Sequence, residues 1–178
     1  SSAASDVYKR QKFNRFVTAV AARCSQLLNY KALADDADID MPTAKNWVNI
    51  LETLGIIFLL HPYSNNVLKR TIKTPKVYFY DTGLVCYLTR WSSPEVAEIG
   101  AMSGALLENF TVSEIMKSYQ NAGLEPYLYF YRDRDAKEID VILEGDGKLC
   151  PLEIKKTATP DKRLTRVFSV MDRSPCQE

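Results

Sequence analysis

The sequence predicts a mixed α/β protein in which a helical unit is followed by a unit with strands. Helical spacing of apolar residues dominates the first half, and its clearest stripe covers 43–54. Short strands are expected in the second half at 127–131, 138–144 and 148–155. The last two are joined by Asp146-Gly147, the preferred dipeptide of a two-residue hairpin turn. This order indicates two successive units.

The first unit begins with helices. Residues 1–12 show no periodicity and are predicted to be a linker or a cloning scar. A helical pattern starts at Phe13, a second short helix follows Asn29 as N-cap, and Pro42 suits the first turn of a third. Gly55 is placed to end that third helix.

After these helices the pattern changes to strands. Apolar runs at 56–60 and 77–80 flank a long, polar and basic segment. Three helices followed by a two-stranded ribbon with a basic tip are typical of a winged helix, which we predict for 13–91. Ser92-Ser93-Pro94 marks the boundary to the second unit, 92–178.

The charge distribution favours nucleic acid as a partner of the first half. Residues 1–90 hold 12 Lys/Arg against 7 Asp/Glu, whereas 91–178 hold 11 against 15. A winged helix contacts DNA through its third helix and its wing. The candidate contacts are Lys45, Asn49, Lys69, Arg70, Lys73 and Lys76. The alternative is that this unit is a protein–protein adaptor.

Composition excludes several classes of protein. No apolar run approaches the ~20 residues needed to cross a bilayer, so no membrane role is expected. Four scattered cysteines are typical of a reduced, cytoplasmic setting. With His61 as the sole histidine, a zinc site is not expected, and any metal needs oxygen ligands.

The hairpin has a register that can be derived from its turn. Centring the turn on Asp146-Gly147 places Asp140 opposite Glu153, with Lys155 on the same face. Like charges directly opposite each other destabilise a sheet unless a cation compensates them. Lys155 is one such cation, and a bridging divalent ion is a stronger one. The opposite face is the predicted core face, made of Ile139, Val141, Leu143, Cys150, Leu152 and Ile154.

A third acid comes from the helix expected at 104–119. Glu108 lies near the centre of the stripe that should face the sheet. A carboxylate there is costly unless it is paired or binds a metal. The alternative to a metal is an ion pair with Arg132 or Lys155.

A helix Glu108, a strand Asp140 and the Glu153-x-Lys155 motif on the next strand resemble the PD-(D/E)XK, or restriction-endonuclease-like, superfamily. The resemblance implies a restriction-endonuclease-like mixed sheet for 92–178. It implies that Asp140 and Glu153, with Glu108, hold Mg²⁺ or Mn²⁺. Lys155 would then position the attacking water or stabilise phosphate charge during hydrolysis of DNA.

More narrowly, roughly 13–160 resembles the domain of unknown function at the C-terminal end of many bacterial and archaeal AAA-type ATPases. The matching stretches are Leu28-Asn29-Tyr30, Pro42-Thr43-Ala44-Lys45-x-Trp47, Tyr78-Phe79-Tyr80-Asp81-Thr82-Gly83-Leu84, Tyr131-Arg132-Asp133, Glu138-Ile139-Asp140 and Glu153-Ile154-Lys155. The family implies an N-terminal P-loop ATPase module as a partner. This chain has no GxxxxGK, so no ATP site is expected in it.

Two functional hypotheses follow. The first is a Mg²⁺-dependent DNA endonuclease associated with an AAA-type ATPase. The second is a catalytically inactive nuclease-like fold that acts with the winged helix as a DNA- or protein-binding module. Because the fold normally adds a strand after the helix expected at 161–171, the core is also expected to be truncated at its C-terminal end.

Overall fold

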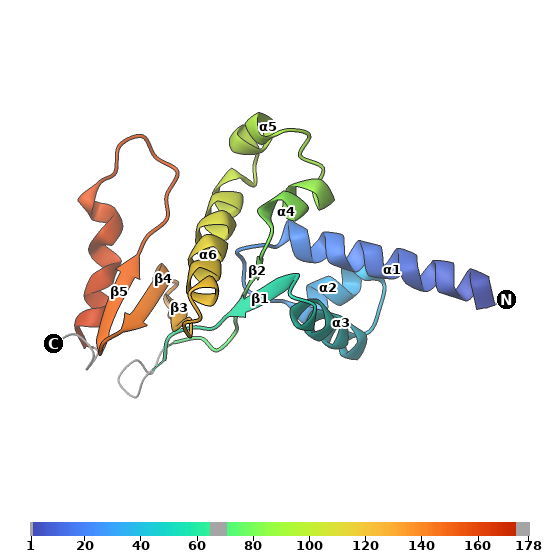
Figure 1. Cartoon of the computed structure of the whole chain (residues 1–178), viewed down its shortest axis with the longest axis horizontal. Helices are drawn as coiled ribbons and strands as arrows, with labels where there is room; N and C mark the ends of the chain where they lie inside the picture. The colour runs from blue at the N-terminus through green and yellow to red at the C-terminus, as the bar shows by residue number, and fades with distance from the viewer. Residues whose placement is uncertain (1, 65–70, 174–178) are drawn as a thin grey trace.

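The computed structural model describes residues 2–64 and 71–173, which form helices and two small antiparallel sheets (Figure 1). The elements are α1 (Ser2–Ala22), α2 (Tyr30–Ala37), α3 (Met41–Thr53), β1 (Ile57–Leu60), β2 (Lys76–Phe79), α4 (Thr82–Leu88), α5 (Pro94–Ile99), α6 (Ser103–Asn121), β3 (Leu128–Arg132), β4 (Glu138–Gly145), β5 (Lys148–Leu152) and the 3₁₀ helix η1 (Lys162–Arg173). The mixed α/β class predicted from the sequence is confirmed.

Helix α1 begins about three turns before the boundary that periodicity suggested. The pattern predicts a helix from Phe13, but the helix starts at Ser2. Residues 2–11 are exposed, so no apolar stripe marks them, although alanine and charged residues favour helix. The segment 1–12, predicted to be a linker or a cloning scar, is therefore helical from Ser2 onward.

The next two helices are capped as their sequences indicate. The side chain of Asn29 accepts a hydrogen bond from the backbone of Ala32, and Asp40 accepts one from Thr43. Asp40 is the N-cap of the third helix, and Pro42 lies in its first turn as predicted. Each cap satisfies an otherwise unpaired backbone N–H. The three predicted helices of the first unit are confirmed.

Strands β1 and β2 form the first sheet and also touch the second. They pair antiparallel, and Leu27 adds an isolated antiparallel bridge on the free side of β2. Beyond β1, Pro62 forms a parallel bridge with Phe130 of β3, and the N–H of Tyr63 donates to the carbonyl of Phe130 at 2.6 Å. The two sheets are therefore joined along one edge by main-chain contacts.

The second sheet has the order β3-β4-β5, and its hairpin register is the predicted one. Val141 pairs with Leu152, and Gly145 pairs with Lys148 on either side of the Asp146-Gly147 turn. The ladder ends at Leu152, so β5 is three residues shorter than predicted. The stretch that carries the candidate site residues therefore lies just beyond the strand.

Strand β4 carries a bulge that the sequence did not reveal. It advances three residues, from Ile139 to Ile142, where β3 advances only two, so Asp140 and Val141 share one position. Such a bulge shifts the alternation of side chains by one residue. Ile139 and Ile142 consequently pack in one cluster with Met171, whereas Val141 packs in the cluster under α6. The predicted core face, which joined Ile139 to Val141, is wrong at this point.

Helix α6 lies between the two sheets and packs against both (Figure 1). Val112 and Met116 share a buried cluster with Tyr78 of the first sheet and Val141 of the second. The other face of the second sheet is covered by η1, whose Met171 is fully buried. A helix was predicted at 161–171, and the observed one has 3₁₀ geometry.

A buried amide fixes α6 to the first sheet. Asn109 is fully buried, and its Oδ1 accepts from the N–H of Phe79 at 2.8 Å. Its Nδ2 donates to the carbonyl of Phe79 at 3.1 Å and to the hydroxyl of Thr82 at 2.9 Å. The hydroxyl of Ser25 also donates to the carbonyl of Ala105 at 2.7 Å. These contacts set the rotation of α6 and therefore the direction of Glu108.

Candidate active site

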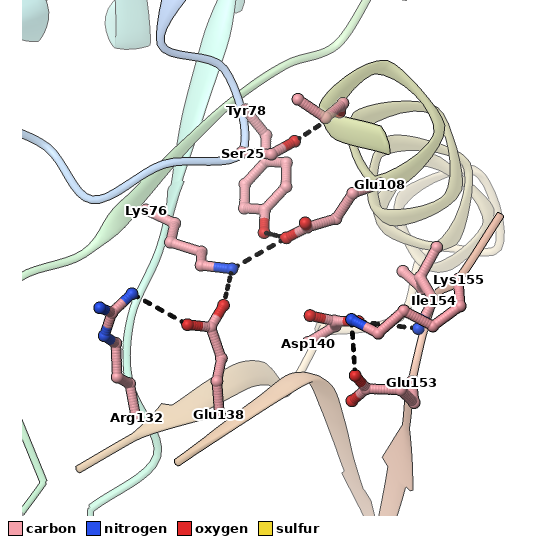
Figure 2. A network of polar contacts seen from close by, with 11 residues as sticks. Ser25, Lys76, Tyr78, Glu108, Arg132, Glu138, Asp140, Glu153, Ile154 and Lys155 are labelled. Atoms are coloured by element: carbon pink, nitrogen blue, oxygen red, sulfur yellow. Dashed lines mark hydrogen bonds and ion pairs between the residues drawn. The ribbon is translucent and has the colours of Figure 1, made fainter. Parts of the chain in front are cut away.

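Glu108 lies in the second turn of α6 and points toward strand β2 (Figure 2). Its Oε1 accepts hydrogen bonds from the hydroxyl of Tyr78 at 2.7 Å and from the ammonium of Lys76 at 2.9 Å. Burial raises the pKa of Glu108, and the positive charge of Lys76 acts against that rise. The ion pair expected as the alternative to a metal exists, but Lys76 forms it rather than Arg132 or Lys155.

Lys76 is the first residue of β2, and only 3% of it is exposed. Its ammonium also donates to Glu138 at 2.5 Å, and the other carboxylate oxygen of Glu138 accepts from Arg132 at 3.0 Å. Burial acts to lower the pKa of Lys76, but the charges of Glu108 and Glu138 outweigh it and raise the pKa. The assignment of Lys76 to a nucleic-acid surface was wrong, because this side chain is inside the protein.

Asp140 is turned toward the α6 side by the bulge in β4. Its Oδ2 accepts a hydrogen bond from the backbone N–H of Ile154 at 2.8 Å and lies 3.8 Å from the ammonium of Lys155. The side chain of Asp140 thus extends the contact between the strands after the backbone ladder has ended at Leu152. Glu153 therefore lies next to Asp140 but does not form a backbone ladder pair with it.

Glu153 has one satisfied and one unsatisfied carboxylate oxygen. Oε1 lies 2.8 Å from the ammonium of Lys155, which forms an ion pair with it. Oε2 is buried and has no hydrogen-bond partner among the described residues. Burial raises the pKa of Glu153, and the hydrogen bond with Glu153 raises that of Lys155.

The structure therefore brings Asp140, Glu153 and Lys155 together and holds Glu108 beside them. Glu108 and Asp140 interact electrostatically, since the charge of Asp140 also raises the pKa of Glu108. Within residues 2–64 and 71–173, no group of three or more His, Cys, Asp or Glu side chains is arranged to hold a metal ion. Glu108 is engaged by Lys76 instead.

Asp140 and Glu153 nevertheless fit a hard divalent cation. Mg²⁺ in proteins is usually held by one or two carboxylates together with waters. The buried Oε2 of Glu153 is an acceptor that its surroundings leave unpaired, which is costly in an apolar environment. The donor set is all oxygen, which suits Mg²⁺ or Mn²⁺ and does not suit zinc.

The candidate nucleic-acid residues are placed unevenly. Lys45 and Asn49 are exposed on α3, and the ammonium of Lys45 lies 5.6 Å from the ring centroid of Tyr30. Lys73 is exposed just before β2. The positions of Lys69 and Arg70 lie outside the described residues.

Three residues of the network were not predicted as part of the site: Lys76, Tyr78 and Glu138. Glu138 carried a signal, because it belongs to the Glu138-Ile139-Asp140 motif. Lys76 and Tyr78 lie in a strand that is buried on both faces, so no alternation of polar and apolar residues marks them. Their partners are separated from them by at least 30 positions in the sequence.

Comparison with known families follows the division of the chain into two parts. Residues 2–95 match a family described as Domain of unknown function (DUF8612). The chain belongs to the DUF8612 family. Downstream of this DUF8612 region, residues 103–176 match a second family, Domain of unknown function (DUF4143), a domain found C-terminal to AAA-type ATPases. Glu108, Asp140, Glu153 and Lys155 all lie in the second match.

Two curated relatives are similar to most of this DUF8612 chain. They are the uncharacterized proteins Rv2008c of Mycobacterium tuberculosis and Mb2031c of Mycobacterium bovis, each 31% identical over 144 residues. The alignment covers 80% of this chain but 32% of each relative, so the chain spans about a third of their length. No solved structure matches the chain. No described helix is long and apolar enough to span a bilayer.

Proposed function

We propose that the second unit hydrolyses phosphodiester bonds in DNA with the help of Mg²⁺ or Mn²⁺. The observation that carries the proposal is that Asp140 and Glu153 both lie at Lys155, while the buried Oε2 of Glu153 has no partner among the described residues. Two adjacent acids and an unsatisfied carboxylate oxygen lower the stability of a fold, so we expect them to serve a function. A restriction-endonuclease-like arrangement of the second sheet is part of this proposal.

Each residue of the site has a distinct part in the mechanism. Asp140 and Glu153 would hold the divalent ion, which would supply Lewis-acid chemistry and positive charge at the phosphate. Lys155, about half exposed and anchored by Glu153, orients the attacking water and donates to the phosphate oxygen that gains charge. Glu108 borders the site and is held by Lys76 and Tyr78.

In this proposal the first unit binds the DNA substrate. A winged helix would place the exposed side of α3, with Lys45 and Asn49, against duplex DNA, and Lys73 would contact phosphate beside it. The alignment covers only 32% of each relative, so the relatives are much longer than this chain, and DUF4143 is associated with AAA-type ATPases. A P-loop ATPase module of the parent protein is therefore the proposed partner.

Calorimetric titration of Mn²⁺ and Mg²⁺ into the chain tests the metal site. We expect saturable binding that Asp140→Asn and Glu153→Gln each abolish, while Asp146→Asn at the exposed turn leaves it intact. Cleavage of linear and plasmid DNA should require the metal and should be lost in Asp140→Asn. Metal-dependent cleavage that survives at full rate in purified Asp140→Asn would rule out the mechanism.

A second function is favoured by the position of Lys76. Its ammonium contacts Glu108 and Glu138, so an internal cation already neutralises acids that a metal would otherwise hold. In that case the fold is a non-enzymatic module that binds DNA or protein. Absence of metal binding, together with higher stability of Asp140→Asn and Glu153→Gln through relief of charge repulsion, would favour this alternative.

A further inference from the structure

The network around Glu108 has the charge balance of a site that already contains one cation. Four carboxylates lie in it, from Glu108, Glu138, Asp140 and Glu153 (Figure 2). Three cationic side chains face them, from Lys76, Arg132 and Lys155. The formal charge of this group is therefore −1, and one divalent ion brings it to +1. Without the charge of Lys76, the same group would have a formal charge of −2, and Glu108 would lose the cation that contacts it.

Lys76 forms a bridge between two carboxylates, as a bound cation would. Its ammonium lies 2.9 Å from Glu108 and 2.5 Å from Glu138, so it bridges two carboxylates that come from different elements. Lys76 is 3% exposed, whereas the side chains of Glu108 and Glu138 are 16% and 27% exposed, so solvent compensates these acids only in part. Lys76 belongs to β2 of the first unit, whereas Glu108 and Glu138 belong to the second unit.

We propose that Lys76 is a positioning residue that takes the place of a second metal ion, so that the site binds a single divalent ion through Asp140 and Glu153. The single-ion part of this inference rests on the proposed function. The part that concerns Lys76, Glu108 and Glu138 does not, because it depends only on two carboxylates that share one buried ammonium. Glu108 is consequently a partner of Lys76 and not a direct metal ligand.

Removing the ammonium should create a metal site. Methionine at position 76 keeps the length and apolar stem of lysine but removes the ammonium that Glu108 and Glu138 share, so that only Arg132 still pairs with Glu138. We expect the Lys76→Met chain to bind one more Mn²⁺ than the parent chain, and this extra ion should be lost when Glu108→Gln is added. Lys76→Arg keeps the charge and is the matched control, with the stoichiometry of the parent.

Calorimetric titration of Mn²⁺ into the whole 178-residue chain and these variants is the test, together with thermal unfolding with and without Mn²⁺. Mn²⁺ should raise the melting temperature of Lys76→Met more than that of the parent. Identical stoichiometry and identical metal-induced shifts in both proteins would overturn the proposal. Binding of Mn²⁺ to Lys76→Met alone, with none to the parent, would support the role of Lys76 while the proposed nuclease site fails.

A second variant keeps the test decisive if Lys76→Met does not fold. Glu108→Gln in the parent background retains acceptors for Tyr78 and Lys76 and should fold. We expect it to weaken Mn²⁺ binding by no more than about tenfold, the lower end for a residue outside the coordination shell. Loss of binding as complete as in Asp140→Asn would make Glu108 a direct ligand and would overturn the proposal.

Discussion

At the scale of single residues, replacing Asn109 is expected to lower the stability of the fold clearly. It is fully buried between α6 and β2 and pairs with both main-chain groups of Phe79. Asn109→Ala leaves these groups unpaired, and a buried unsatisfied group costs about 1–3 kcal/mol. We expect the free energy of unfolding to fall by at least that amount in urea denaturation.

Asn121 provides the control for this prediction because it lies in the same helix and is exposed. Asn121→Ala should change the free energy of unfolding by less than about 0.5 kcal/mol, as is usual for exposed positions. Equal effects of the two substitutions would show that Asn109 does not join α6 to the first sheet in solution.

At this scale, the sequence showed which side chain is unusual for its position but not which residue it pairs with. Glu108 was identified because a carboxylate in an apolar stripe must be paired, and the structure pairs it. The partner is Lys76, which the sequence analysis placed on an exposed wing. Helical spacing reveals which face of its own helix a residue occupies, but not which distant strand reaches that face. Burial of Lys76 is a property of tertiary packing between β2, α6 and β4.

At the scale of elements, the β4–β5 hairpin is the part that local sequence determines best. Asp146 and Gly147 have φ angles of 52° and 71°, which is the geometry expected of the predicted type I′ turn. Gly147→Ala puts a β-carbon into the left-handed region, which costs about 1–2 kcal/mol. We expect a loss of stability of that size in chemical denaturation.

Gly145→Ala is the matched control. A β-carbon at Gly145 meets no atom within 4 Å, and its backbone does not need a positive φ. Its stability should stay within about 0.5 kcal/mol of the parent. A similar loss in both variants would indicate that strand packing, and not the turn, limits the hairpin.

The bulge in β4 shows where element-scale prediction ends. The turn fixes which residues of β4 and β5 face each other, and the observed pairs from Gly145 to Val141 agree with it. It contains no information about β3, whose pairing inserts the extra residue at Asp140 and Val141. Because the bulge decides that Asp140 faces α6, the geometry of the candidate site depends on a contact between strands that are not joined by a tight turn.

At the scale of the whole molecule, the two sequence units are structurally connected. The first unit supplies Lys76 and Tyr78, and the second supplies Glu108 and Glu138, to one buried network. Main-chain hydrogen bonds from Tyr63 to Phe130 and from Phe130 to His61 add to this connection. Sequence patterns could indicate a boundary near Ser93, where α5 is capped, but not that the candidate site would draw on both sides of it.

The proposed binding of DNA by the first unit would depend on a broad surface and would show a characteristic dependence on salt. If Lys45 and Lys73 contact phosphates, affinity for duplex DNA should fall linearly with salt on logarithmic axes, with a slope of about −0.9 per contact. Reversing either charge, in Lys45→Glu or Lys73→Glu, should weaken binding to all sequences and reduce the slope by about 1. Fluorescence anisotropy over a range of salt concentrations measures both the affinity and the slope.

Lys117→Glu is the control for this prediction. It makes the same charge change on α6, beside Glu114, and should have little effect. Equal weakening by all three substitutions would point to net charge alone, and salt-independent binding would favour the protein–protein adaptor.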